Sequence, residues 1–296
     1  MKEEHESVLL HEAVVGLNLS EGDVVIDATL GLGGHSAEIA RIVGKRGVVL
    51  GIDADSQSLQ KAETRLRDAP ATMRYALGNF RDIDAHVHAA GITHAQGVLF
   101  DLGWNASQLA AGRGFSFHAS DPLVMTYASK PDTTTAATVV NTWREEDLKE
   151  ILRTLGEERY AGRIASAIVT ARKDAPIARA DELAGIVEHA VPAAYRRRKT
   201  HPATKTFQAL RMVVNGELAS LEAALPKALA LLAPHGRLAV ITFHSLEDGL
   251  VKRIFRRFAN EGTATLITKK PVAPTREAVR QNPRARSAKL RIIEKT

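Results

Sequence analysis

The chain has 296 residues, of which 45% are hydrophobic and 25% charged, and its formal net charge is +6 at pH 7. This length and composition fit one large α/β domain, or a core domain that carries a smaller one, and they exclude a fibrous, disordered or membrane-spanning chain. Cysteine is absent, which excludes disulfides and thiolate metal sites, and the acidic start lacks the basic and apolar regions of a signal peptide, so a soluble cytoplasmic protein is expected.

The first hundred residues alternate between strand and helix patterns. The β-branched run VVIDAT (24–29) leads into a glycine turn and then into SAEIARIVG, whose apolar residues recur at helical spacing. Further strand patterns occur in GVVLGID (47–53), TMRYALGNF (72–80) and AQGVLFDLG (95–103), and a polar-faced helix opened by Ser56 follows the first of these. Strands that alternate with helices predict a parallel, doubly wound sheet.

After residue 104, helical periodicity replaces the strand patterns. We therefore expect an inserted helical domain at 109–204, between two segments of the core domain at 1–108 and 205–296. The stretch 204–225 keeps one apolar face and is expected to form one long helix that leads back to the core. The helices expected inside the insertion are REEDLKEILRTLG (144–156), RYAGRIASAIVTARK (159–173) and DELAGIVEHAV (181–191).

The C-terminal part returns to strand patterns and carries most of the positive charge. GRLAVITFHS (236–245) reads as a buried strand, LVKRIFRRF (250–258) as an amphipathic basic helix and SAKLRIIEK (287–295) as an alternating strand. Residues 252–296 contain 13 Lys and Arg against 3 Asp and Glu and so carry +10, whereas residues 1–251 carry −4. This asymmetry favours a polyanionic partner, RNA or DNA before a membrane, although a solvated basic tail has the same composition.

The glycine-rich turn DATLGLGGHS (27–36) fits three nucleotide ligands unequally well. A phosphate-binding P-loop needs a lysine where this chain has His35. A dinucleotide fingerprint would place its third glycine at Ser36, where the helix must pack closely against the strand. A turn for S-adenosylmethionine needs an acid at the end of the first strand and glycines that let the backbone approach the ligand, and Asp27, Gly31 and Gly33 keep that spacing. A turn with no ligand is the structural alternative.

Two further acids follow strand patterns and narrow the choice. Asp53 is placed to accept hydrogen bonds from both ribose hydroxyls of a nucleoside, which weakens the purely structural interpretation of the turn. Asp101 ends the fourth strand pattern, at the sheet edge where doubly wound folds bind ligands. An acid there suits methylation of an exocyclic amine, because an oxygen that accepts the amine N–H helps to free the nitrogen lone pair for attack. A helix cap is the alternative role for Asp101.

Two other patterns match known sites only in part. Tyr127 and Lys130 are three residues apart, whereas the Tyr/Lys pair of short-chain dehydrogenases needs a spacing of four. His86 and His88 are two apart in an expected helix and so do not share a face. A dehydrogenase is therefore the weaker interpretation, and no metal site is predicted.

Polar and basic groups elsewhere suggest contacts to a nucleic acid. His244 and Ser245 follow the fifth strand and could hydrogen-bond a base or its phosphate; alternatively Ser245 caps a helix, with Asp248 at the capping-box position. The basic loop YRRRKTHPATK (195–205) could bind RNA phosphates and supply affinity rather than base choice. The expected RNA contacts are Arg197, Arg198, Lys199, Lys205, Arg284 and Arg286.

Long sequence blocks along nearly the whole chain point to one family. They include HESVLLHEAV, IDATLGLGGHS, GIDAD, GNF, GEERYAGRIASAIV, HPATKTFQALRMVVNGEL, GRLAVITFHSLED and NPRARSAKLR. With these blocks the chain resembles the bacterial ribosomal RNA small subunit methyltransferase H family. The resemblance implies a class I S-adenosylmethionine-dependent methyltransferase fold, that is, a Rossmann-like α/β core with an inserted all-helical domain. It also implies methylation of the exocyclic N4 of a cytidine in the decoding region of 16S rRNA, in the small ribosomal subunit.

The resemblance also implies individual ligand positions. From the residues alone, Phe80 would be ordinary core and Gln108 an exposed polar side chain. The implied S-adenosylmethionine contacts are Gly33, Gly34 and His35 in the turn, Asp53 at the ribose, Phe80 beside the adenine, and Asp101 and Gln108.

Two departures from the family pattern fall on the expected substrate side. Residues 104–107 read WNAS where the family usually has Val-Ser-Ser-Pro, and Val124, Thr126 and Ala128 stand where it usually has two acids and an arginine. These departures leave open a catalytically weak RNA-binding relative that keeps the cofactor site. The glycine turn leaves an NAD(P)-dependent oxidoreductase as a further alternative.

Overall fold

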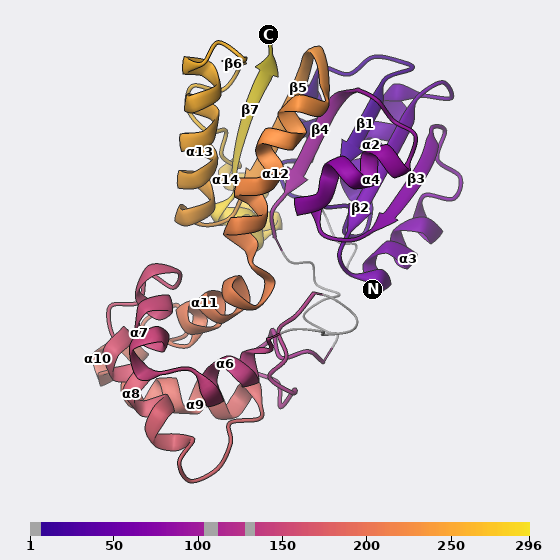
Figure 1. Cartoon of the computed structure of the whole chain (residues 1–296). Coiled ribbons are helices and arrows are strands. Elements are labelled where there is room, and N and C mark those ends of the chain that lie inside the picture. The colour runs from indigo at the N-terminus through magenta and orange to yellow at the C-terminus, as the bar shows by residue number, and fades with distance from the viewer. Residues whose placement is uncertain (1–6, 104–111, 128–133) are drawn as a thin grey trace. The chain divides into compact units, whose positions relative to one another are not determined.

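The computed structural model describes residues 7–103, 112–127 and 134–296 (Figure 1). The chain forms two compact units: residues 1–105 with 218–296, here the core unit, and residues 106–217, here the helical unit. The second boundary expected at 204/205 differs from this division, because helix α11 (Thr204–Asn215) buries Phe207 and Leu210 in the apolar cluster of the helical unit. The first division falls among residues that the structure does not describe.

A mixed sheet forms the centre of the core unit. In the described part of the chain it has seven strands in the order β3-β2-β1-β4-β5-β7-β6. The strands β1 to β5 pair in parallel, and β7 runs antiparallel to both β5 and β6. Their bounds are β1 Val24–Asp27, β2 Val48–Asp53, β3 Thr72–Leu77, β4 Ala95–Asp101, β5 Leu232–Thr242, β6 Ala264–Leu266 and β7 Lys289–Lys295. The predicted parallel, doubly wound sheet is thus confirmed, and only the three-residue strand β6 had no clear sequence pattern.

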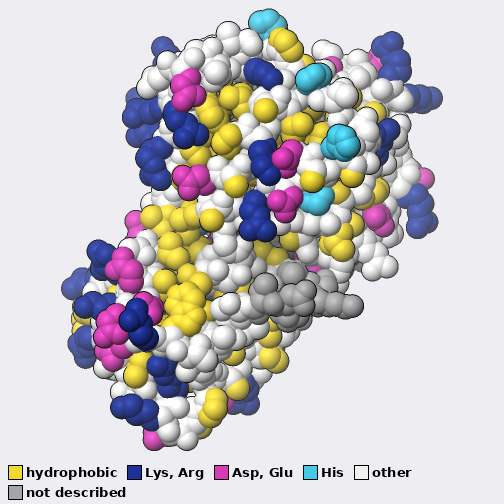
Figure 2. Space-filling model, in the orientation of Figure 1, with side chains coloured by type: hydrophobic (Ala, Val, Ile, Leu, Met, Phe, Trp, Pro, Cys, Tyr) yellow, Lys and Arg dark blue, Asp and Glu magenta, His cyan; other side chains and the backbone are white. Residues whose placement is uncertain are grey.

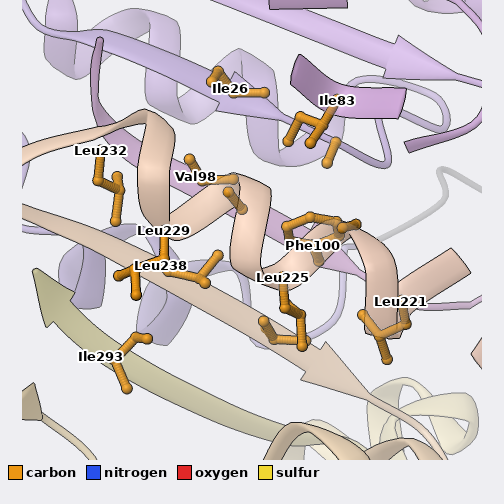
Figure 3. Close-up of a cluster of buried hydrophobic side chains, with 14 of the residues drawn as sticks. Ile26, Ile83, Val98, Phe100, Leu221, Leu225, Leu229, Leu232, Leu238 and Ile293 are labelled. Carbon is orange, nitrogen blue, oxygen red and sulfur yellow. The ribbon is translucent and has the colours of Figure 1, made fainter. Parts of the chain in front are cut away.

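Helices cover both faces of this sheet, as the alternation of buried side chains along its strands requires. Ile26, Phe100 and their neighbours on one face pack against α4, α12 and α13, and Figure 3 shows Leu225 and Leu229 of α12 over Val98 and Leu238. The opposite face packs against α1 and α2, and α3 adjoins β2 and β3. The bounds are α1 Leu10–Leu17, α2 Gly34–Val43, α3 Ser56–Arg65, α4 Ile83–Ala89, α12 Glu217–Leu231, α13 Ser245–Asn260 and α14 Arg276–Gln281, with short turns η1 Phe80–Asp82 and η2 Pro283–Ser287.

The helical unit has an apolar centre of its own. Its buried side chains include Leu148 and Leu152 of α7, Ile164 and Ile168 of α8 and Leu183 of α9. All three helices expected in the insertion are confirmed. The bounds are α6 Ala136–Thr142, α7 Glu145–Thr154, α8 Ala161–Ala171, α9 Ala180–Ala190 and α10 Ala193–Arg196, with α11 as given above. None of the helices described is both long and apolar enough to cross a membrane.

The expectation of one long helix over 204–225 is wrong. Gly216 adopts a left-handed conformation with φ of 57° and ends α11, while its N–H donates to the carbonyls of Met212 and Val213. Left-handed residues end helices and are most often glycine, because a Cβ is disfavoured there. The apolar periodicity runs on across Gly216 into α12, so periodicity alone did not show the break.

Truncating Leu225 tests the packing of α12 on the sheet. Leu225 is fully buried, so Leu225→Ala should lower the free energy of unfolding of the core unit by about 2–5 kcal/mol through lost burial and a residual cavity. Urea denaturation followed by circular dichroism measures the change. Leu77→Ala is the matched control, because Leu77 is 57% exposed and its truncation should change the free energy by less than about 0.5 kcal/mol. Equal effects of the two truncations would contradict this packing.

Candidate active site

Three aspartates end three neighbouring strands at the carboxyl edge of the sheet. Asp27 ends β1, Asp53 ends β2 and Asp101 ends β4, and β1 lies between the other two strands. After β1 the chain moves outward through β2 and β3, and then returns to place β4 on the other side of β1. This reversal is the topological switch point at which doubly wound sheets bind ligands. The strand order therefore places Asp101 at this edge, as the sequence predicted.

The glycine turn after β1 is held by hydrogen bonds to two of these acids. Asp27 is buried and accepts from the Ser36 hydroxyl at 2.7 Å, and the Gly31 N–H donates to Asp53 Oδ2 at 2.8 Å. Gly31 and Gly33 have φ of 54° and 76°, which only glycine adopts readily. Gly33 caps α2, whose first residue is Gly34. Ser36 thus has a structural partner at the position where a dinucleotide fingerprint requires glycine.

Asp53 is fixed by the backbone yet keeps capacity to bind a ligand. Its Oδ1 accepts from the Asp55 N–H at 2.8 Å and its Oδ2 from Gly31. A carboxylate oxygen can accept two hydrogen bonds, so each oxygen retains one acceptor site. Burial raises the pKa of Asp53 to about 6. Phe80, in η1 after β3, packs edge-on against Phe100, with ring centroids 5.5 Å apart, and is partly buried against the core.

The ring of His35 is part of the wall behind Asp101. It is buried, with Nε2 3.2 Å from the Val8 carbonyl oxygen and Nδ1 3.6 Å from Asp101 Oδ2. Burial lowers the pKa of His35 and favours a neutral ring. A neutral ring that donates from Nε2 to Val8 presents the lone pair of Nδ1 to Asp101. Because the ring of His35 faces Val8 and Asp101, a ligand at this position would be bound by the backbone N–H groups at the start of α2, which lack partners within the helix.

Asp101 combines a fixed backbone with an unsatisfied carboxyl group. Its N–H donates to the Thr29 hydroxyl at 2.6 Å, while its Oδ1 is a buried atom without a hydrogen-bond partner among the described residues. Burial, with a contribution from the negative charge of Glu247, raises the pKa of Asp101 to about 7. Such a carboxyl group is suited to accept a hydrogen bond or a proton at neutral pH.

The start of α13 brings a second pair of groups to the same edge. His244 is the N-cap, and its Nδ1 accepts from the Glu247 N–H at 3.3 Å. Its Nε2 lies 3.0 Å from Glu247 Oε1, and Glu247 Oε2 accepts from the Phe243 N–H. The expected alternative with Ser245 as cap and Asp248 in the capping box is wrong by one residue: Ser245 is exposed, and Asp248 binds Lys289 and Arg291 instead. Glu247 is the site residue that the sequence did not reveal, since it looked like an ordinary residue of the first helical turn.

The residues expected to contact RNA lie in both units. Arg197, Arg198 and Lys199 are exposed after α10, and Arg198 lies over the ring of Tyr195 at 4.9 Å. Lys205 is half-buried and donates to the Glu157 carbonyl at 2.6 Å, so it is less available than the other three. Arg286 is exposed in η2 of the core unit, whereas the side chain of Arg284 is outside the description.

The expected substrate-side residues are described only in part. Gln108, the stretch 104–107 and Ala128 lie outside the described residues. Thr126 is buried and Val124 half-buried in the helical unit. The Thr126 position, where the family usually has an arginine, therefore carries a neutral side chain that is enclosed rather than presented to solvent.

The raised pKa of Asp101 has a consequence for stability. Its folded-state pKa exceeds that of an unfolded aspartate, so ionisation destabilises the folded protein as pH rises from about 4 towards 7. Asp101→Asn removes this penalty and allows Nδ2–H to face His35 Nδ1. The variant should be more stable than the wild type by about 1–2 kcal/mol above pH 7. This is less than the whole pKa shift of Asp101 would imply, because 22% of its side chain reaches solvent. Urea denaturation at pH 4.5 and 8 measures the difference, which should be much smaller at the lower pH.

Asp248→Asn is a control for which the opposite change in stability at pH 8 is expected. Burial works to raise the pKa of Asp248, but its hydrogen bonds to Arg291 and Lys289 outweigh burial and lower the pKa. This variant should therefore lose stability at pH 8 and approach the wild type as pH falls below about 4. A gain in stability for Asp248→Asn, or none for Asp101→Asn at pH 8, would contradict the assignment of these two carboxyl groups.

Comparison with known proteins identifies relatives over the whole chain. The MraW methylase family matches residues 2–296. A ribosomal RNA small subunit methyltransferase H of Persephonella marina is 43% identical over 292 residues, covering 99% of each chain. One from Brevibacillus brevis is 40% identical over 307 aligned residues, covering 98% of each.

Solved structures show only a distant likeness. An rRNA methylase from Streptococcus thermophilus aligns over 96% of this chain and 93% of its own, at 14% identity and a TM-score of 0.46. Aeropyrum pernix fibrillarin with natively bound S-adenosyl-L-methionine aligns over 96% and 73%, at 13% identity and a TM-score of 0.41. The assignment to a family rests on the sequence match. The chain belongs to the MraW methylase family and is an S-adenosylmethionine-dependent methyltransferase.

Proposed function

We propose that this protein methylates the exocyclic N4 of a cytidine in the decoding region of 16S rRNA, with the small ribosomal subunit as its substrate. The observation that carries the proposal is the carboxyl group of Asp101: it ends β4 at the switch point, and its buried Oδ1 has no partner among the described residues. The names of the relatives, which are small-subunit rRNA methyltransferases, supply the class of substrate.

The charges around the site suit the cofactor. Within the described residues, no lysine or arginine lies within ion-pair distance of Asp27, Asp53 or Asp101. A site with buried carboxyl groups and no cation disfavours the pyrophosphate of a dinucleotide and favours a cationic ligand. S-adenosylmethionine is a sulfonium cation, and when bound it supplies an electrophilic methyl group. The free acceptor sites of Asp53 suit the two ribose hydroxyls, and the partly buried Phe80 is positioned by η1 beside the end of β3.

Asp101 has the features that methylation of an amine requires. The exocyclic N4 of cytosine is a weak nucleophile because its lone pair is delocalised into the ring. If Asp101 Oδ1 accepts one N–H of this amine, it orients the nitrogen and helps to localise the lone pair for in-line attack on the methyl carbon. S-adenosylmethionine, when bound, would supply the methyl group and keep the bonding electrons on its sulfur, and the Asp101 carboxylate would accept the proton that the methylated nitrogen loses.

The groups behind Asp101 preserve its geometry. The neutral ring of His35 is fixed by the Val8 carbonyl and limits the rotation of the Asp101 carboxyl group from one side. Glu247 adds negative charge nearby, which opposes ionisation of Asp101 and keeps its pKa near neutrality. His244, held by Glu247, is a candidate to contact the base or its phosphate.

Cofactor binding tests the role of Asp53. Asp53→Ala should weaken binding of S-adenosylmethionine by roughly 10- to 100-fold, the loss expected for hydrogen bonds to a charged group. Titration calorimetry measures the affinity, and circular dichroism checks the fold. Asp68→Ala is the control, because Asp68 is exposed and precedes β3, at the opposite end of the strands. Unchanged affinity in Asp53→Ala would remove Asp53 from the cofactor site.

Methyl transfer tests the substrate and the role of Asp101. Incubation with small subunits that lack the modification, followed by nucleoside mass spectrometry, should give N4-methylcytidine, mapped to the decoding region. Asp101→Asn should reduce kcat by roughly 10²- to 10⁴-fold with a smaller change in cofactor affinity. A methyl group on another atom would overturn the N4 assignment. Bound cofactor without any transfer by the wild type would instead indicate a catalytically weak RNA-binding relative.

A further inference from the structure

A stripe of four cations runs along the exposed side of α13. It consists of Lys252, Arg253, Arg256 and Arg257, all exposed, and we call it the α13 stripe. In Figure 2, Lys and Arg side chains gather over the part of the core unit where Figure 1 places α13. At 100° per residue these positions span about 140° of the helix circumference, so they share one broad face.

The orientation of this face is fixed by the packing of the helix. The other side of α13 buries Leu250, Val251, Ile254, Phe255 and Phe258 in the apolar cluster of the core unit. Rotation of the helix would expose these side chains to water, at a cost of roughly 1.5–3 kcal/mol for each one. The four cations are therefore held towards solvent together rather than scattered.

The charge of the stripe is largely uncompensated. Among the described residues, the only carboxylate within 4.0 Å of any of the four is Glu261, which lies 3.9 Å from Arg257 on an exposed surface. Such a pair contributes little. Glu222 lines the groove between α12 and α13 together with Arg253, but no ion pair joins them. Like charges on one helix face destabilise it slightly, so the stripe is a feature that stability alone does not explain.

The helix also connects the stripe to the active site. α13 begins at Ser245, next to the cap formed by His244 and Glu247, and Glu247 contributes to the raised pKa of Asp101. At 1.5 Å per residue, Lys252 lies about 10 Å and Arg257 about 18 Å along the axis from that start. The stripe therefore begins about two helical turns from the end of α13 that borders the site.

We propose that the α13 stripe binds the phosphate backbone of the substrate RNA on one side of the target nucleotide. The proposal rests on the proposed function, because it takes the substrate to be RNA. Contacts of this kind give affinity and register without reading base identity. A membrane surface fits less well, because the stripe consists of cations alone and the large apolar side chains of the same stretch of helix, from Leu250 to Phe258, are buried in the core.

The test neutralises the stripe without removing the helix. The stripe variant combines Lys252→Gln, Arg253→Gln, Arg256→Gln and Arg257→Gln, because glutamine has a helix propensity close to that of lysine and arginine. The matched control removes the same charge from exposed cations on and after α2 and α3: Arg41→Gln, Lys45→Gln, Arg46→Gln and Arg67→Gln. Circular dichroism and calorimetry with S-adenosylmethionine should show an unchanged fold and cofactor affinity in both.

Binding to small ribosomal subunits that lack the modification is measured by filter retention between 50 and 200 mM salt. The slope of log affinity against log salt should fall by about 3 for the stripe variant, since each phosphate contact contributes roughly 0.7–0.9. Its affinity at the lower salt concentration should fall at least tenfold, and kcat at saturating subunits should stay unchanged. The control variant should keep the wild-type slope.

The outcomes separate this inference from the proposed function. An unchanged slope in the stripe variant, or an equal change in the control, overturns the role of the stripe even if the wild type methylates the subunit. Loss of binding to vesicles of phosphatidylglycerol and phosphatidylcholine, with RNA binding intact, overturns it in favour of a lipid surface. Absence of methyl transfer by the wild type, with the slope difference present, overturns the proposed function alone.

Discussion

The site depends on the burial of carboxyl groups at one edge of a parallel sheet. Three adjacent strands end in aspartate, and burial raises the pKa of all three carboxyl groups. Their partners are backbone N–H groups, one hydroxyl and a neutral imidazole rather than cations. This arrangement disfavours the folded state at neutral pH and persists because the surrounding sheet and helices stabilise it. The same imbalance favours a cationic ligand at this edge of the sheet.

The layered core supplies the rigidity that this arrangement needs. Strands of the switch point are buried on both faces, so that neither Asp27 nor Asp101 can relax outward without moving a packed strand. α13 serves three purposes in this core. Its apolar side closes one face of the sheet, its first turn presents His244 and Glu247 to the site, and its remaining side is free for the α13 stripe.

Local patterns predicted most of the fold and the positions of Asp53 and Asp101, because a parallel sheet brings the ends of its strands to one edge whatever the details of packing. They failed where the structure depends on the backbone conformation of a single residue or on a contact between residues far apart in the sequence. Gly216 ends α11 within an unbroken apolar repeat. Local patterns also did not show that the ring of His35 lies against Asp101 and Val8, residues far from it in the sequence, and its contact with the cofactor stays a prediction. Glu247 showed no sequence signal, since its effect on Asp101 acts through space.

The sequence by itself determined the strand and helix order, the glycine turn, the acids at the strand ends, the excess of positive charge after residue 251 and the resemblance to a methyltransferase family. These are properties of short segments or of composition. Only the tertiary structure decided which oxygen of Asp101 is left without a partner among the described residues, which way the ring of His35 points, and that the charge of Glu247 acts on Asp101. Burial and through-space electrostatics depend on which segments pack together, and no local pattern records that.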